Sequence, residues 1–322
     1  MVGMARPQSV LIPTFLVCVA SVMFGSVPFF AKQLTADGMA PAAIALARYG
    51  LTSLGFLPFL CLKGGKWRTS LWGYIAGIGL SVGWIGYVEA LDLMPVATVA
   101  VIYMTFPFFT IGIGWAVFGD RPGRRSMIAA GMIVIAAALV LRPDSIGEVD
   151  PKAILVVFIT PVTFGFAINV LTHKLTSLPP ISRMASVSLG SSSGLLPLVL
   201  ALPMVEIVPA TALSWVWIAG MAVISALIPQ LLYTTNVPRI GAAKAAMAGS
   251  VELPTSFLVG WLAFGEQIGW PEAIAAILIL TAIGATPARR VAGVTTRITT
   301  RAHVPDPPQT LPIQSRPPAT DR

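Results

Sequence analysis

The chain has 322 residues, of which 56% are apolar and only 11% are charged, and its net charge is +8. Soluble domains carry about 25% charged residues, so most of this chain is poorly suited to water. Its apolar blocks of about 17 to 24 residues match the length that an α-helix needs to cross a bilayer core of about 30 Å. The two cysteines, Cys18 and Cys61, lie within apolar blocks, so we expect neither a disulfide framework nor a metal site.

Ten apolar segments are predicted to be transmembrane helices. In chain order they are 9–31, 41–62, 70–92, 96–118, 126–142, 152–173, 183–203, 212–235, 241–264 and 270–287. The strands of a β-barrel would alternate apolar and polar residues, whereas the run 127–141 is apolar throughout. The sequence therefore predicts an all-α integral membrane protein.

The basic residues predict the orientation of the chain. With the N-terminus in the cytoplasm, only Lys32, Arg142 and Lys152 of the 21 Lys and Arg fall outside, and Arg48 falls inside a span. Short cytoplasmic loops carry an excess of Lys and Arg, so we expect a protein of the cytoplasmic membrane with both termini inside. The charges are scattered over short loops, which argues against a nucleic-acid surface.

The chain repeats itself at a spacing of about 146 residues. The recurring pairs are Trp115–Asp120 with Trp261–Glu266, Tyr87 with Tyr233, and Pro107 with Pro254. We therefore predict a first five-helix repeat over 1–146 and a second over 147–290. Five is an odd number, so the second repeat enters the membrane upside down, as in many secondary transporters.

Residues 291–322 are rich in Thr, Arg and Pro. Such a composition cannot bury a hydrophobic core. We expect a disordered cytoplasmic tail.

These features resemble the drug/metabolite transporter superfamily, and within it the EamA-like exporters of ten spans. The residues that carry the resemblance are Phe24-Gly25, Lys32, Arg48, Pro107, Phe118-Gly119-Asp120, Gly241-Ala242-Ala243, Pro254 and Phe264-Gly265-Glu266. The family usually has Glu where this chain has Asp120, and the charge is kept. The resemblance implies two inverted five-helix repeats around a central cavity, and export of amino acids, related metabolites or toxic compounds.

Two ionisable residues lie deep within predicted spans. A charge at the centre of a bilayer costs about 2.5–3.5 kcal/mol on insertion scales, so such residues usually face a cavity or a partner. Glu252 lies halfway along the ninth span and Arg48 about two turns into the second. One hypothesis is that Glu252 binds a substrate ammonium group or a coupling proton. The alternative is an ion pair with Arg48 that only fixes packing, and the two are not exclusive.

Aromatic and amide side chains within the spans are further candidates to line a central cavity. They are Trp84, Tyr87, Tyr103, Asn169, Gln230 and Tyr233. Each could instead bond to a neighbouring helix. Tyr87 and Tyr233 are favoured because a repeat-related pair can flank a site at the midplane.

Prolines and helix-ending carboxylates are the predicted structural elements of the mechanism. Prolines 28, 107, 161, 229 and 254 interrupt five spans, and we interpret Pro107 and Pro254 among them as hinges. Asp120 and Glu266 end repeat-related helices, where a negative charge opposes the helix dipole. We therefore interpret both carboxylates as structural latches.

The predicted function is a secondary carrier, an exporter working by alternating access, rather than an enzyme. The segment Gly190–Gly194 matches the nucleophile-elbow pattern of hydrolases, but that motif needs a turn from a strand to a helix. Here the segment lies within a span, and we interpret its small residues as a site of close helix packing. There is no Walker-type loop for ATP. We expect a small-molecule substrate, membrane lipid and no cofactor, and leave open proton coupling, a homodimer, and a non-coupled facilitator or channel.

Overall fold

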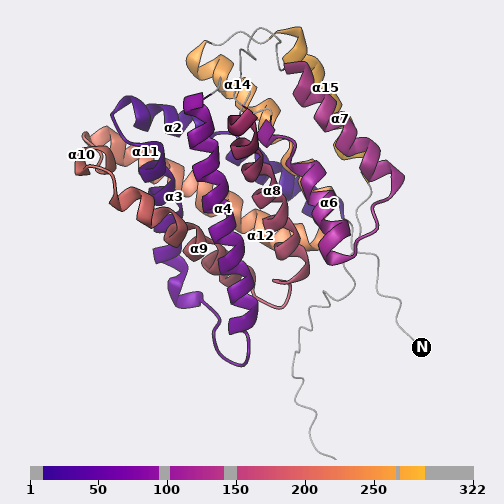
Figure 1. Ribbon diagram of the computed structural model, residues 1–322, viewed down its shortest axis with the longest axis horizontal. Helices are drawn as coiled ribbons and strands as arrows, with labels where there is room; N and C mark the ends of the chain where they lie inside the picture. Colours follow the sequence, from indigo (N-terminus) through magenta and orange to yellow (C-terminus); the bar gives the residue numbers. More distant parts are fainter. Residues whose placement is uncertain (1–9, 94–101, 141–150, 266–268, 287–322) are drawn as a thin grey trace, which may run out of the picture.

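The computed structural model describes residues 10–93, 102–140, 151–265 and 269–286, and the regular structure in these ranges is helical (Figure 1). The apolar segments predicted from the sequence form its helices. In the first half they are α1 (Leu11–Phe24), α2 (Val27–Ala36), α3 (Pro41–Phe56) with a 3₁₀ turn (Leu57–Phe59), α4 (Trp67–Leu93), α6 (Phe106–Phe118) and α7 (Arg124–Val140).

The second half follows the same plan. Its helices are α8 (Pro151–His173), α9 (Pro180–Leu200), α10 (Met204–Ile207), α11 (Ala212–Ala222), a π-helical turn η3 (Val223–Leu227), α12 (Ile228–Ile240), α13 (Ala242–Gly249), α14 (Glu252–Phe264) and α15 (Trp270–Ala285). The fold is thus all-α, with two repeats of five helical crossings. The predicted tail 291–322 and Glu266 lie outside the described residues.

Several predicted spans are not single helices. The first is interrupted by a turn between α1 and α2 and the ninth by a turn between α13 and α14, and the eighth changes to a π-helical turn between α11 and α12. In the fourth, a turn at Met104–Thr105 precedes α6. Pro28, Pro107 and Pro229 each occupy the first turn of the helix after a break, where a missing N–H costs nothing. Pro161 instead lies inside the continuous α8, so it does not interrupt that span.

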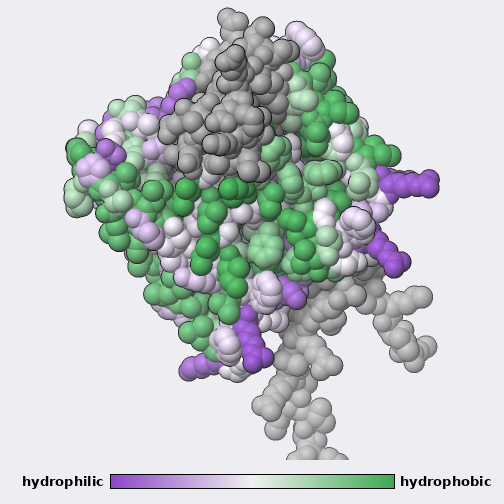
Figure 2. Space-filling model, in the orientation of Figure 1, coloured by the Kyte–Doolittle hydropathy of each residue, from purple (hydrophilic) through white to green (hydrophobic). Residues whose placement is uncertain are grey.

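The surface is suited to lipid. By length and apolar composition, four described segments could cross a membrane, Leu11–Ala36, Pro41–Phe59, Ala212–Ile240 and Ala242–Phe264, and shorter apolar helices accompany them. Many leucine, phenylalanine and tryptophan side chains on these helices are exposed, among them Leu11, Phe15, Leu54, Trp215 and Leu262. Figure 2 shows hydrophobic residues over most of the coloured face, with hydrophilic residues near its ends.

Small residues let α4 pack closely against α8 and α9. A Cβ added at Gly77 would overlap the backbone of α9 at Val187, and one at Gly190 would overlap the backbone of α4 at Tyr74. Hydroxyl groups reinforce these contacts: Thr160 Oγ1 donates to Gly83 O at 2.8 Å. The predicted packing role of the Gly190–Gly194 segment is confirmed.

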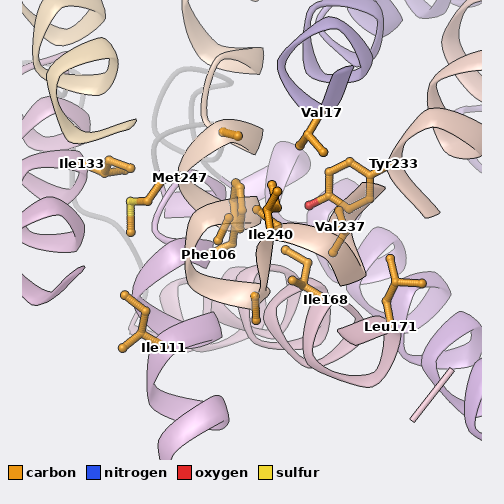
Figure 3. Close-up of a cluster of buried hydrophobic side chains, with 14 of the residues drawn as sticks. Val17, Phe106, Ile111, Ile133, Ile168, Leu171, Tyr233, Val237, Ile240 and Met247 are labelled. Atoms are coloured by element: carbon orange, nitrogen blue, oxygen red, sulfur yellow. The ribbon is translucent and has the colours of Figure 1, made fainter. Parts of the chain in front are cut away.

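The main hydrophobic core joins the two repeats. Phe106 of α6, Ile168 of α8, Tyr233 of α12 and Met247 of α13 meet in one buried cluster (Figure 3). The last helices of the two repeats, α7 and α15, pack side by side along one edge of the molecule (Figure 1). Each repeat therefore completes the core of the other.

Candidate functional site

Three helix breaks meet at one place in the protein. Ser26, between α1 and α2, shares a hydrogen bond of 2.7 Å with Ser225 of the π-helical turn. The neighbouring Gly25 packs against the break between α13 and α14, because an added Cβ would lie 2.6 Å from Thr255 Cβ and 3.0 Å from Glu252 O. Interrupted helices at such a place free backbone groups for a ligand or for motion.

Glu252 is the first residue of α14 and so lies at this junction. Its side chain is half-buried, although it comes from the middle of the predicted ninth span. It interacts electrostatically with Arg48, Tyr87, Tyr103 and Tyr233. Phe24, whose neighbour Gly25 packs against the Glu252 backbone, has its ring centre 5.5 Å from the Arg48 guanidinium carbon and 6.0 Å from the Tyr233 ring centre. Glu252, Arg48 and the three tyrosines come from five separate segments of the chain and form one cluster.

Arg48 of α3 is the positive member of the cluster. Its guanidinium carbon lies 5.5 Å from the ring centre of Phe24 and 5.3 Å from that of Tyr49. Both residues are described, and no ion pair within 4.0 Å joins Arg48 to Glu252. The two opposite charges are therefore near each other without direct contact.

Aromatic side chains line the cluster. Trp84 stacks on Tyr87 with ring centres 5.8 Å apart, Tyr87 meets Tyr103 edge to face at 6.2 Å, and Tyr103 lies 5.7 Å from Phe106. Figure 3 shows the Tyr233 hydroxyl pointing towards the same core. The predicted pair Tyr87 and Tyr233 thus approaches the cluster from different helices.

Three buried donors in this region have no hydrogen-bond partner in the structure: Arg48 Nε, Trp84 Nε1 and Tyr233 Oη. Buried polar atoms are nearly always paired, and an exception calls for an explanation such as a bound molecule. All three of these groups can donate a hydrogen bond. The site is therefore suited to a ligand that carries acceptor oxygens.

The two predicted amides are engaged elsewhere. Asn169 is fully buried, and its Nδ2 donates to Thr110 O at 2.8 Å and Gly165 O at 2.9 Å. Gln230 Nε2 donates to Ser188 Oγ at 3.0 Å. Both side chains join neighbouring helices, and the structure does not bring them together with the tyrosines.

Asp120, the first predicted latch residue, follows the end of α6. Gly119 ends this helix with φ at 72°, a left-handed conformation suited to glycine. The next residue, Asp120, contacts His173 at the end of α8 through Oδ2 and Nε2, 3.1 Å apart. The His173 ring stacks on Phe118 at 4.7 Å, and Lys174 Nζ lies 5.9 Å from the centre of the Phe118 ring.

The repeat-related end of α14 has the same design. Gly265 adopts φ of 67°, and Phe264 receives Lys32 Nζ of α2 at 4.0 Å from its ring centre. Lys32 ends the first span and Lys174 ends the sixth, so the corresponding helices of the two repeats supply the cations. We name as latches the contacts of Phe118 with His173 and Lys174 and the contact of Phe264 with Lys32, of which the two Phe–Lys contacts are related by the repeat.

Sequence reasoning missed several of these residues. His173, Ser26 and Ser225 gave no signal, because their partners lie far away in the sequence. The repeated Phe-Gly-Asp and Phe-Gly-Glu motifs indicated one partner of each latch, and the other partner could not be recognised from the sequence. Within the described ranges, no three His, Cys, Asp or Glu side chains gather to hold a metal ion.

The family model for the EamA-like transporter family matches residues 11–142 and again residues 151–286. Together these ranges cover most of the chain. The chain belongs to the EamA-like transporter family. As an EamA-like transporter it is a multi-pass membrane protein that moves a small molecule, and not an enzyme.

Individual relatives agree with this assignment. An uncharacterized transporter of Archaeoglobus fulgidus is 22% identical over 83% of this chain and 93% of its own length. Biotin transporters of two Escherichia coli strains are 22% identical over 74% of this chain and 80% of their own length. A chain of known crystal structure superimposes with a TM-score of 0.68 at 16% identity, covering 85% of this EamA-like transporter and 96% of that chain.

Proposed function

We propose that this EamA-like transporter is a secondary carrier that exports small amphoteric metabolites, amino acids or related compounds, across the cytoplasmic membrane by alternating access. The observation that supports this most is the arrangement of Arg48 and Glu252. Their opposite charges lie in one aromatic cluster at the junction of the helix breaks, with no ion pair within 4.0 Å between them. A zwitterion would place its carboxylate on Arg48 and its ammonium group on Glu252.

The surroundings of the two charges favour the same class of substrate. Two unpaired donors, Trp84 Nε1 and Tyr233 Oη, can add hydrogen bonds to a carboxylate. Charge-assisted hydrogen bonds are about twice as strong as neutral ones. The aromatic rings of Tyr87 and Tyr103 offer apolar surface to the rest of the molecule.

Glu252 also supports proton coupling. A carboxylate surrounded by apolar and aromatic groups can bind either a proton or a cationic group, but not both at once. Exchange of the two at one side chain would couple outward movement of the substrate to inward movement of a proton. The driving force is then the proton gradient.

The two latches are the proposed gates. With the N-terminus in the cytoplasm, Phe118 with His173 would close the inner side and Phe264 with Lys32 the outer side. Opening one latch while the other is closed would expose the central site to one face at a time. The helix breaks at Gly25, Ser225 and Ser250–Val251 would absorb the movement.

A second candidate substrate is a carboxylate without an amine. The Escherichia coli relatives are named biotin transporters. The three unpaired donors suit acceptor oxygens, whereas Glu252 supplies the only described carboxylate in the cluster. A neutral, protonated Glu252 would accept such a substrate.

The test is transport by the purified protein in proteoliposomes, with and without an imposed pH gradient. Labelled amino acids, biotin and a cationic dye would be compared. The proposal expects saturable uptake, counterflow when unlabelled substrate is trapped on the far side, and stimulation by the gradient. Uptake that does not saturate and shows no counterflow would identify a channel, and saturable uptake unaffected by the gradient would identify a facilitator.

A further inference from the structure

A shallow apolar groove lies on the outside of the helix bundle, and none of its lining residues belongs to the central cluster. It has a volume of about 220 Å³ and is formed where the chain passes from α3 to α4, against α9. Its lining residues are Leu60, Leu62, Trp67, Ser70, Leu71, Tyr74, Ser186 and Leu189. Trp67 and Leu71 are about half exposed, at 49% and 45%, so the groove is open to the surroundings.

Positive charges stand at one end of this groove. The groove residues Leu62 and Trp67 enclose a tight turn, in which Lys66 N donates to Lys63 O at 3.3 Å. Two glycines with positive φ, Gly64 at 65° and Gly65 at 77°, make that turn. Lys63, Lys66 and the following Arg68 are exposed. Figure 2 shows hydrophilic residues at the lower end of the molecule, where Figure 1 places this turn.

The segments that line the groove contain no negative charge of their own. The sequence has no Asp or Glu between Asp37 and Glu89, and none between Asp150 and Glu206. The helices α4 and α9 that form the groove therefore place no described acidic side chain next to Lys63 and Lys66. An anionic group of another molecule can therefore approach these lysines without competition from a carboxylate of these segments.

We propose that this groove binds an anionic glycerophospholipid, with the phosphate on Lys63 and Lys66 and part of an acyl chain along Leu62, Trp67 and Leu71. Basic clusters beside membrane helices attract anionic lipid, at about 1 kcal/mol per Lys or Arg near the surface. Trp67 suits the boundary between headgroup and hydrocarbon, where tryptophan is enriched. The proposal needs only that the chain is a membrane protein, not that the proposed substrate is right.

The size and place of the groove favour a lipid chain over an enclosed small-molecule ligand. A pocket that encloses a drug-sized ligand has about 300–1,000 Å³, which is more than this groove offers. Its apolar walls belong to helices whose outer faces already meet hydrocarbon. A second copy of the chain is the remaining alternative, and the experiment separates the two.

The test measures lipid retained by the purified protein. Protein in detergent would be mixed with dioleoylphosphatidylglycerol or dioleoylphosphatidylcholine, and bound lipid counted by native mass spectrometry. The double variant Lys63→Gln/Lys66→Gln should bind phosphatidylglycerol roughly 30-fold more weakly, the effect of two lost charges near the surface. The matched control, Arg124→Gln/Arg125→Gln, removes two exposed charges at the start of α7 and should bind like the unchanged protein.

The apolar half of the site has its own variant. Leu71→Gln keeps the charges and alters an exposed residue, so it should fold and lose phosphatidylglycerol and phosphatidylcholine alike. Equal binding of the two lipids by the unchanged protein would overturn the proposal, as would equal losses in the two double variants. A protein dimer that persists without lipid and dissociates on Leu71→Gln would assign the groove to a second copy instead. None of these readouts involves transport, so they leave the proposed function untouched.

Discussion

Glu252 and Arg48 carry the chemistry of the proposed transport, because they are opposite charges held near each other without an ion pair. Their neighbours, Tyr87, Tyr103 and Tyr233, are aromatic. A charged group that is half-buried among aromatic side chains is stabilised largely by what binds to it. Single substitutions here should therefore change binding and coupling more than folding.

Glu252→Gln tests the coupling role directly. Glutamine keeps the shape of the side chain but can neither bind a proton nor attract an ammonium group by charge. Uptake in proteoliposomes should lose its response to a pH gradient and fall at least tenfold. Glu206→Gln, on the short helix α10, is the control and should transport normally. A Glu252→Gln protein with wild-type rate and unchanged pH response would remove the coupling role.

Tyr233→Phe and Asn169→Ala should have opposite profiles. The Tyr233 hydroxyl has no partner, so its removal should leave the unfolding temperature unchanged or slightly higher, while the KM for substrate rises several-fold. Asn169→Ala removes the two hydrogen bonds that the amide donates to Thr110 O and Gly165 O, which costs about 1–3 kcal/mol of stability at about 0.5–1.5 kcal/mol each. Thermal unfolding in detergent and uptake kinetics measure both. A destabilised Tyr233→Phe protein with normal KM would show that the hydroxyl is structural.

At the level of helices, the interruptions within the spans distinguish this protein from a bundle of continuous helices. The Ser26–Ser225 hydrogen bond joins the break after α1 to the π-helical turn before α12. A double-mutant cycle of Ser26→Ala and Ser225→Ala should give a coupling free energy of about 0.5–1.5 kcal/mol, the usual worth of one hydrogen bond. Unfolding midpoints of the four proteins measure it. Additive effects would mean that the two breaks are not joined.

A second prediction at the level of helices concerns the glycines that end α6 and α14. Gly119 has φ of 72°, so Gly119→Ala forces a side chain into the left-handed region at a cost of about 1–2 kcal/mol. Gly131→Ala, in the middle of α7 with open space around it, is the control and should be neutral or stabilising. Thermal unfolding distinguishes them. Equal effects of the two substitutions would contradict the capping role of Gly119.

The sequence predicted the helices well and their interruptions only in part. Blocks of apolar residues mark the spans because the bilayer demands length and hydrophobicity, whatever the neighbours. Prolines marked the interruptions next to Pro28, Pro107, Pro229 and Pro254, but Pro161 lies in an intact helix. Contacts between distant segments, such as Asp120 with His173, could not be predicted because no local pattern encodes them.

The whole molecule is best understood as two copies of one design. Each repeat ends its fourth span with Phe-Gly followed by an acidic residue, and in each case a cation from the first span of the other repeat lies over the phenylalanine ring. Lys32 and Lys174 are those cations. In the proposed mechanism, such exchange between repeats would provide two similar closures, one on each face of the membrane, as alternating access requires.

The most direct test of this account locks one latch at a time and asks from which side the centre can be reached. In a background with Cys18 and Cys61 replaced by alanine, Phe118→Cys with His173→Cys locks one latch through a short thiol cross-linker, and Lys32→Cys with Phe264→Cys locks the other. Tyr103 would be replaced by p-azidophenylalanine as the central probe, for coupling to an impermeant alkyne.

We predict that each lock stops transport and that the two locks restrict labelling of position 103 to opposite faces of the membrane. Labelling from the same face with either lock, or transport that continues with both latches cross-linked, would contradict alternating access around this site.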